Sequence, residues 1–184
     1  MREKEYFLKS ERLGFGYWDE EDMELAWGLF GDPEVSRYVG GPFSREQVAA
    51  RVRSEIVSQE RIGAQYWPLF TLSGGEFVGC CGLKSRPEPG CYEMGFYLIR
   101  GAHGKGYAKE AALRVIGYAF GKMCAKALYA GHNPRNEASR ALLGKLGFVQ
   151  TGEELYPPTG LMHPLYRLEP MPGAEGRSLQ PNRR

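Results

Sequence analysis

A glycine-rich stretch, Arg100–Ala111, contains the residue types and spacing that are best suited to chemistry. It reads RGAHGKGYAKEA and lies between an apolar segment and an amphipathic one. A helix that starts here would present unpaired N–H groups and a partial positive charge, which bind anions. Gly104, Gly106 and Ala108 are small enough for a phosphate to approach the backbone, and Lys105 adds charge. The stretch therefore predicts either a phosphate-binding turn or a tight strand-to-helix connection.

Two common phosphate-binding patterns do not fit this stretch. A Walker A loop that began at Gly101 would require Lys after Gly106, where the sequence has Tyr107. A dinucleotide-binding pattern that began at Gly104 would require glycine at position 109, which is Lys109. The residues alone indicate an anion site and do not identify the anion.

The elements that must position this turn follow from hydrophobic periodicity and turn residues. Helices are predicted from Met23 to Phe30, from Ser44 to about Arg61, from Ala108 to Phe120 and from Asn136 to Leu146. Strands are predicted at Leu13–Tyr17, Tyr66–Leu72, Phe77–Leu83, Tyr92–Ile99, Ala127–Ala130, Phe148–Thr151 and His163–Leu168. Because helices and strands mix without strict βαβ alternation, the pattern predicts an α+β fold around a mainly antiparallel sheet.

Composition narrows the class of protein. The 184 residues include 25 glycines, 42% are hydrophobic, and the net charge is +2. This is too apolar for a disordered chain, and no run approaches the roughly 20 residues of a membrane span. The near-neutral charge argues against a nucleic-acid partner. We expect a single domain over residues 1–170, followed by a flexible tail over 171–184.

The cysteines and the N-terminus indicate a compartment. The four cysteines form no C-x-x-C pair, and the three histidines do not fall at metal-ligand spacings, so no metal site is predicted. The simplest interpretation is reduced cysteine in a cytoplasmic protein. The charged segment Met1–Glu5 precedes no apolar stretch of a signal peptide, which agrees with a cytoplasmic location.

The turn resembles the pyrophosphate loop of GNAT N-acetyltransferases, Gln/Arg-x-x-Gly-x-Gly/Ala, here His103 to Ala108. His103 departs from the usual Gln or Arg, but the RimJ/RimL-like branch has an aromatic residue there, followed by Gly-Lys-Gly-Tyr-Ala-x-Glu-Ala. Further matches occur in family order at Ser10–Leu13 with Asp22, Asp32–Val39, Phe77–Leu83, Tyr92–Leu98 and Asn133–Phe148. Each match is weak alone, and their ordered combination is specific.

The resemblance implies a GNAT-like fold and acetyl-CoA as co-substrate. The fold would be a mixed sheet of about six or seven strands, flanked by about four helices, with a V-shaped split between the fourth and fifth strands. A glycine inside a strand, here Gly95, often marks a bulge or a close backbone approach, and in the resembling family a bulge here opens the split. The alternative for Gly95 is the incidental absence of a side chain on a crowded face. The residues expected to bind acetyl-CoA are Phe96, Tyr97, Leu98, His103, Gly104, Lys105, Gly106, Tyr107, Ala108, Asn136 and Lys145.

Several of these roles have structural alternatives. In the resemblance, the main chain at positions 96–98 pairs with the pantetheine arm and binds the thioester oxygen. Helix capping is the alternative for Asn133 and Asn136, and we expect cofactor contact for Asn136 and capping for Asn133. Lys145 would reach the 3′-phosphate or simply lie in solvent.

Glu93 and Ser139 are the expected catalytic residues. On an unbroken strand Glu93 shares a face with Gly95 and Tyr97, where a carboxylate could accept the amine's proton or only bind a cationic substrate. In the resembling branch the serine at position 139 lies near the sulfur and protonates it. The alternative for Ser139 is a hydroxyl bonded to its own helix.

The acceptor stays open at this level. The resemblance favours an N-terminal α-amine of a protein or peptide, and a small amine such as a polyamine, amino acid or antibiotic is second. Trp18, Tyr38, Tyr156 and Tyr166 are candidates for its pocket, with a place in the core as their alternative. An acyl-CoA-binding module without turnover is the competing class. The chain is expected to be a monomer or homodimer.

Overall fold

A computed structural model describes residues 5–170, and the expected tail at 171–184 lies outside the described residues. Within that range, one mixed sheet has the strand order β1-β2-β3-β4-β5-β6-β8-β7. The strands are β1 (Leu8–Lys9), β2 (Leu13–Phe15), β3 (Tyr66–Thr71), β4 (Phe77–Ser85), β5 (Cys91–Leu98), β6 (Ala127–Gly131), β7 (Val149–Tyr156) and β8 (Leu161–Leu168). The helices are α1 (Met23–Phe30), α2 (Pro33–Ser36), α3 (Arg45–Ile62), α4 (Tyr107–Gly121) and α5 (Glu137–Lys145), with short 3-10 turns at Glu20–Asp22 and Arg100–Ala102.

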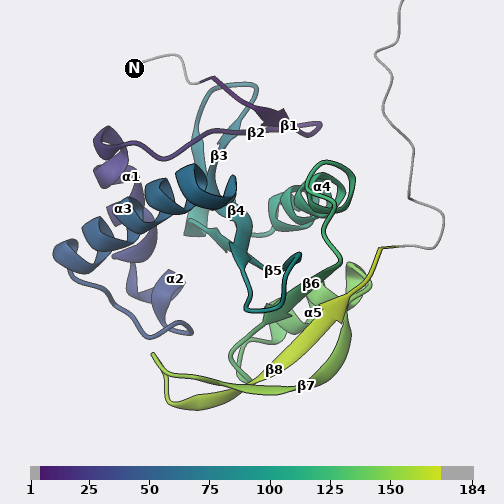
Figure 1. Cartoon of the computed structure of the whole chain (residues 1–184). Helices are drawn as coiled ribbons and strands as arrows, with labels where there is room; N and C mark the ends of the chain where they lie inside the picture. The colour runs from purple at the N-terminus through teal and green to yellow at the C-terminus, as the bar shows by residue number, and fades with distance from the viewer. Residues whose placement is uncertain (1–4, 171–184) are drawn as a thin grey trace, which may run out of the picture.

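The sheet separates two hydrophobic cores (Figure 1). On one face, α4 packs Ala112, Val115 and Ala119 against the sheet. On the other face lie α1 and α3. The adjacent cysteines show this division, because Cys81 belongs to the α4 core and Cys80 to the α1–α3 core. Successive residues of a strand point to opposite faces of the sheet, and these two cysteines do so.

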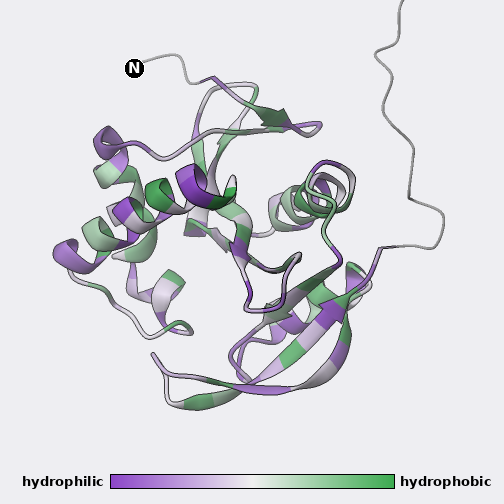
Figure 2. Ribbon diagram, viewed as in Figure 1, coloured by the Kyte–Doolittle hydropathy of each residue, from purple (hydrophilic) through white to green (hydrophobic). Residues whose placement is uncertain are grey.

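Local signals in the sequence account for α3. Ser44 and Gln47 form a reciprocal capping box at its start, and Gly63 ends it in the left-handed conformation at φ +67°. Its buried positions, Val48, Val52 and Glu55, recur at helical spacing. Figure 2 shows the resulting alternation of polar and apolar residues along α3.

The short elements were harder to predict. No helix was predicted between Phe30 and Ser44. In the structure the Asp32 side chain accepts the Glu34 N–H and Pro33 occupies the first turn, so these two residues start α2. The strands β1 and β2 have two and three residues, too few to show a period.

The sheet splits between β5 and β6. These parallel strands pair only from Cys91 to Glu93 against Ala127 to Tyr129, whereas β5 runs on to Leu98. The split was expected between these strands, but it does not arise from a bulge in the β4–β5 pairing, whose register is unbroken at Gly95. A Cβ at Gly95 would lie 2.7 Å from the Tyr66 ring, so this glycine provides room for that ring. The structure therefore supports the alternative interpretation of Gly95, in which a side chain is absent because the face of the strand is crowded, here by Tyr66.

Candidate active site

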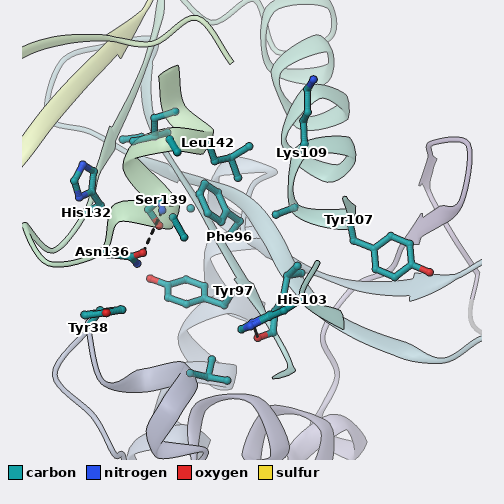
Figure 3. Close-up of a pocket in the computed structure, with 18 of the residues that line it drawn as sticks. Tyr38, Phe96, Tyr97, His103, Tyr107, Lys109, His132, Asn136, Ser139 and Leu142 are labelled. Atoms are coloured by element: carbon teal, nitrogen blue, oxygen red, sulfur yellow. Dashed lines mark hydrogen bonds between the residues drawn. The ribbon is translucent and has the colours of Figure 1, made fainter. Parts of the chain in front are cut away.

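A cleft of about 740 Å³ occupies the split between β5 and β6 (Figure 3). Its walls come from β5, the turn before α4, the end of β6, the first turns of α5, and α2. Of the predicted site residues, only Lys105 does not line it. The others are Glu93, Phe96, Tyr97, Leu98, His103, Gly104, Gly106, Tyr107, Ala108, Asn136, Ser139 and Lys145.

The turn before α4 forms one end of the cleft. Gly104 and Gly106 adopt φ values of +74° and +80°, which side chains on L-residues rarely allow. Gly106 is the N-cap of α4 and has no side chain to cap the helix, and Glu110 N–H is the first to bond back, to the Gly106 carbonyl. The N–H groups of the first turn are therefore not used by the helix and remain available to an anion.

An ion pair between Arg12 and Glu110 connects the residue before β2 to the start of α4. Glu110 accepts the Arg12 N–H, the Arg12 Nε–H and the Ser10 hydroxyl, each at 2.7 Å. Burial alone would raise the pKa of Glu110, but the hydrogen bonds from Ser10 and Arg12 lower it. Arg12 Nη1 also donates to the Lys105 carbonyl at 3.0 Å, and its guanidinium lies over the Tyr107 ring. This ion pair could not be predicted from sequence pattern, because Arg12 and Glu110 lie far apart in the chain.

His103 contacts the end of β5. Its Nε2 lies 3.1 Å from the Leu98 carbonyl oxygen, within hydrogen-bonding distance. The imidazole thereby connects the last residue of β5 to the glycine turn (Figure 3). His103 also lines the cleft.

Of the two asparagines, Asn136 and not Asn133 caps a helix. Asn136 is the N-cap of α5, and its Oδ1 accepts the Ser139 N–H at 3.1 Å. Asn133, for which capping was expected, instead accepts the Arg135 N–H and donates to the Tyr38 carbonyl. Capping engages only the Oδ1 atom of Asn136, so its Nδ2 group is still available to a ligand in the cleft.

Glu93 lies where β5 and β6 part. Its Oε2 is 3.7 Å from Arg86 Nη1, and its side chain is 43% exposed. Desolvation raises the pKa of Glu93 above the ordinary value of 4.5, Arg86 opposes this rise, and Glu154 adds to it. A carboxylate with a raised pKa is a better proton acceptor than an ordinary surface glutamate.

Of the aromatic residues expected at the acceptor pocket, Tyr38 lines the cleft. Trp18 does not: it is buried in the α1–α3 core, and its indole N–H donates to the Tyr66 carbonyl at 2.7 Å. Tyr166 is also buried, with its hydroxyl 3.3 Å from His132 Nε2. His132 itself lines the cleft and was missed by sequence reasoning, because a lone histidine gives no spacing signal.

A bridge connects the β7–β8 turn to the connection between α2 and α3 (Figure 1). The Tyr156 hydroxyl donates to the Val39 carbonyl at 3.5 Å. Pro158 packs so closely on Gly40 that a Cβ there would lie 2.8 Å from it. Val39 directly follows Tyr38, which lines the cleft, so the bridge lies beside this part of the cleft. Desolvation raises the pKa of Tyr156.

The described residues reveal neither a membrane span nor a metal cluster. None of the helices in residues 5–170 is long and apolar enough to cross a bilayer. Across the same residues, no three His, Cys, Asp or Glu side chains come together as metal ligands.

Comparisons with known proteins agree with this arrangement. Residues 12–149 match the model of an acetyltransferase (GNAT) domain. An uncharacterized N-acetyltransferase, p20, of Bacillus licheniformis is 30% identical over 79% of this chain and 83% of its own. An acetyltransferase structure from Agrobacterium tumefaciens, 25% identical, has a TM-score of 0.77 over 92% of this chain and all of that one. RimL, a ribosomal α-N-protein acetyltransferase solved with coenzyme A, is 17% identical with a TM-score of 0.74 over 87% and 95%.

Proposed function

The chain belongs to the GNAT family of acetyltransferases, and from that premise we propose that it transfers an acetyl group from acetyl-CoA to a primary amine by direct attack in a ternary complex. The observation that carries this proposal is the single cleft that joins the glycine turn to Glu93 along the unpaired part of β5. An anion site and a candidate base thus face one continuous space.

The residues of the chain fit acetyl-CoA by their donor chemistry. The free N–H groups at the start of α4 would hold the pyrophosphate. Beyond Glu93, β5 has no strand partner on the split side, so the main chain of Phe96, Tyr97 and Leu98 can bond to the amide groups of a pantetheine arm as a further strand would. One N–H in this segment would polarise the thioester carbonyl, where negative charge develops during attack.

Two side chains would move the protons. Glu93 would accept a proton from the ammonium form of the acceptor, so that a neutral nitrogen attacks the acetyl carbon. As the new C–N bond forms, the C–S bond breaks and the sulfur leaves as a thiolate. Ser139, which lines the same cleft near Asn136, would donate a proton to this sulfur and take up the second proton that the nitrogen loses as it becomes an amide (Figure 3).

The geometry favours a small amine as the acceptor over the protein N-terminus that the sequence resemblance put first. The contacts of Tyr156 with Val39 and of Pro158 with Gly40 bring the β7–β8 turn next to Tyr38, which lines the cleft, and would restrict the space for an acceptor there. A protein N-terminus needs an open groove for the chain that follows it. The likeness to RimL concerns a fold at 17% identity and does not extend to its substrate.

Bisubstrate kinetics test the proposal. Initial rates measured over a grid of acetyl-CoA and amine concentrations should give intersecting double-reciprocal lines, because both substrates must be bound together. Parallel lines would show a covalent acetyl-enzyme and contradict direct attack. Small primary amines should exceed N-terminal peptides in kcat/KM, and the reverse order would restore the protein acceptor.

A further inference from the structure

Arg51 of α3 is a partly buried cation that has no role in the proposed acetyl transfer. Its guanidinium carbon lies 4.0 Å from the centre of the Phe30 ring, 5.0 Å from that of Tyr97 and 5.9 Å from that of Tyr66. Its Nε is buried and has no hydrogen-bond partner among the described residues. An unsatisfied buried donor on a charged group is costly, so its presence requires an explanation.

Neighbouring groups do not neutralise this charge. Glu55, one helical turn further along α3, accepts the Tyr66 N–H at 2.8 Å and pairs with Lys84 Nζ at 3.3 Å. Desolvation raises the pKa of the Tyr97 phenol to about 12 even though Arg51 lowers it, so this phenol is uncharged at neutral pH. Arg51 and Lys84 therefore share one carboxylate, and a positive charge remains on this side of the site.

The opposite side has an excess of negative charge. Arg86 lies among three carboxylates there, 3.0 Å from Glu154 and 3.7 Å from each of Glu88 and Glu93. Lys84, which lies opposite Glu93 on β4, also pairs with Glu55. Its guanidinium also stacks over the Tyr129 ring on β6. The end of the cleft near Glu93, where the acceptor amine would bind, thus has a positive side at α3 and a negative side around Glu93. We call it the acceptor end. The Tyr97 ring lies next to Arg51 on the positive side.

Arg51 also borders a second, smaller pocket, which we call the side pocket. It has a volume of about 320 Å³ and is lined by Phe43, Gln47, Val48, Ala50 and Arg51. Gln47 uses its carbonyl oxygen to accept the Ser44 N–H at 2.7 Å. Arg51 is the only charged residue among these five, and the N–H donors of a guanidinium match a carboxylate.

We propose that the acceptor amine carries an anionic group, in the simplest case a carboxylate, which binds the Arg51 guanidinium beside the Tyr97 ring while its amine faces Glu93. Tyr97 and Glu93 line the same cleft. This inference rests on the proposed acetyl transfer and names its substrate class as amino-acid-like. The two charged sides orient such a molecule, and a simple polyamine would place a second cation against Arg51. Charge complementarity of this kind selects substrates by rejecting the wrong sign.

Matched acceptors test the proposal directly. The probes are amino acids, the corresponding amino acid amides, and the amines that lack the carboxyl group altogether. In the wild-type protein, kcat/KM should be about tenfold to a hundredfold higher for the acids, the range expected of a hydrogen bond to a charged group. Arg51→Met should remove this preference by lowering kcat/KM for the acids alone, and Arg51→Lys should retain part of it.

Arg53→Met is the matched control, because Arg53 is an exposed arginine on the same helix. It should leave the preference for acids unchanged. Thermal unfolding and calorimetric binding of acetyl-CoA establish that each variant is folded. If Arg51→Met does not fold, the anionic subsite is tested by the preference of the wild-type protein for acids and by the reduction of that preference in Arg51→Lys.

Binding measurements separate this inference from the proposed function. The N-acetylated amino acids and their amides are titrated into the protein saturated with CoA, which requires no turnover. Tighter binding of the acids by wild-type protein but not by Arg51→Met supports the anionic subsite even if no amine is acetylated, in which case the proposed transfer alone fails. Equal kcat/KM values for acids and amides, or equal Kd values for their N-acetylated forms, would contradict the anionic subsite.

Discussion

The Nη1 atom of Arg86 lies 3.7 Å from the Oε2 atom of Glu93, and this contact joins the end of β4 to the base of the split in the sheet. Glu93 does not have this cation to itself, since the same Nη1 donates to Glu154 Oε2 at 3.0 Å. Burial and Glu154 both raise the pKa of Glu93, and Arg86 limits the rise. This balance keeps the carboxylate basic and still able to ionise.

Glu93→Gln should lower kcat by about a hundredfold, within the usual range for loss of a general base. In the wild-type protein, kcat should fall as the pH drops through a value above 4.5, because protonated Glu93 cannot accept a proton. This limb should disappear from the pH profile of the variant. Glu88→Gln, which removes another carboxylate near Arg86, is the control and should leave it in place. Unchanged turnover and pH dependence in Glu93→Gln would limit Glu93 to substrate binding.

Arg86→Met should move the acidic limb to higher pH. Removing a nearby positive charge disfavours the ionised form of Glu93, so its pKa rises further. The measurement is the pH profile of kcat, compared with that of Arg61→Met, which removes an exposed arginine at the end of α3. A limb that stays at the same pH in Arg86→Met would show that Arg86 does not act on Glu93.

Ser139→Ala should lower kcat by about tenfold to a hundredfold while the KM for acetyl-CoA changes little. The cap of α5 survives this change, because Asn136 Oδ1 bonds to the backbone N–H of residue 139 and not to its hydroxyl. Ser54→Ala on the exposed side of α3 serves as the control. Full turnover in Ser139→Ala, measured by thiol release, would remove the acid role.

Gly104→Ala should weaken CoA binding by about fivefold to thirtyfold, and it should also lower the melting temperature. The φ of +74° at Gly104 costs an L-residue about 1–2 kcal/mol, so alanine would favour a different conformation of the turn. Gly101→Ala is a close control, since a Cβ there also meets nothing within 4 Å but the backbone is not left-handed. Equal Kd values for the two variants, measured by calorimetry, would show that the turn does not bind the phosphates.

The sequence predicted those parts of the structure that residues close together in the chain form by themselves. The spacing of Gly104, Gly106 and the following apolar positions predicted the turn and α4, and Ser44 with Gln47 predicted the start of α3. These features depend on backbone conformation and capping, which neighbouring residues determine.

Contacts between distant segments could not be predicted in this way. Arg12 with Glu110, Arg51 with Tyr97 and Tyr156 with Val39 meet only after the sheet has formed. Gly95 illustrates the limit, because a strand glycine indicates either a bulge or a close neighbour, and only the position of Tyr66 decides between them. The acceptor end is built from such contacts, which is why the sequence left its substrate open.

The most direct test of acetyl transfer measures thiol release and product mass in one reaction. Purified protein, acetyl-CoA and a panel of small amines and amino acids should release CoA in equal amount to an amine that has gained one acetyl group. Glu93→Gln should suppress both signals together. Tight CoA binding without an acetylated product on any amine would contradict the account and would identify the protein as an acyl-CoA-binding module.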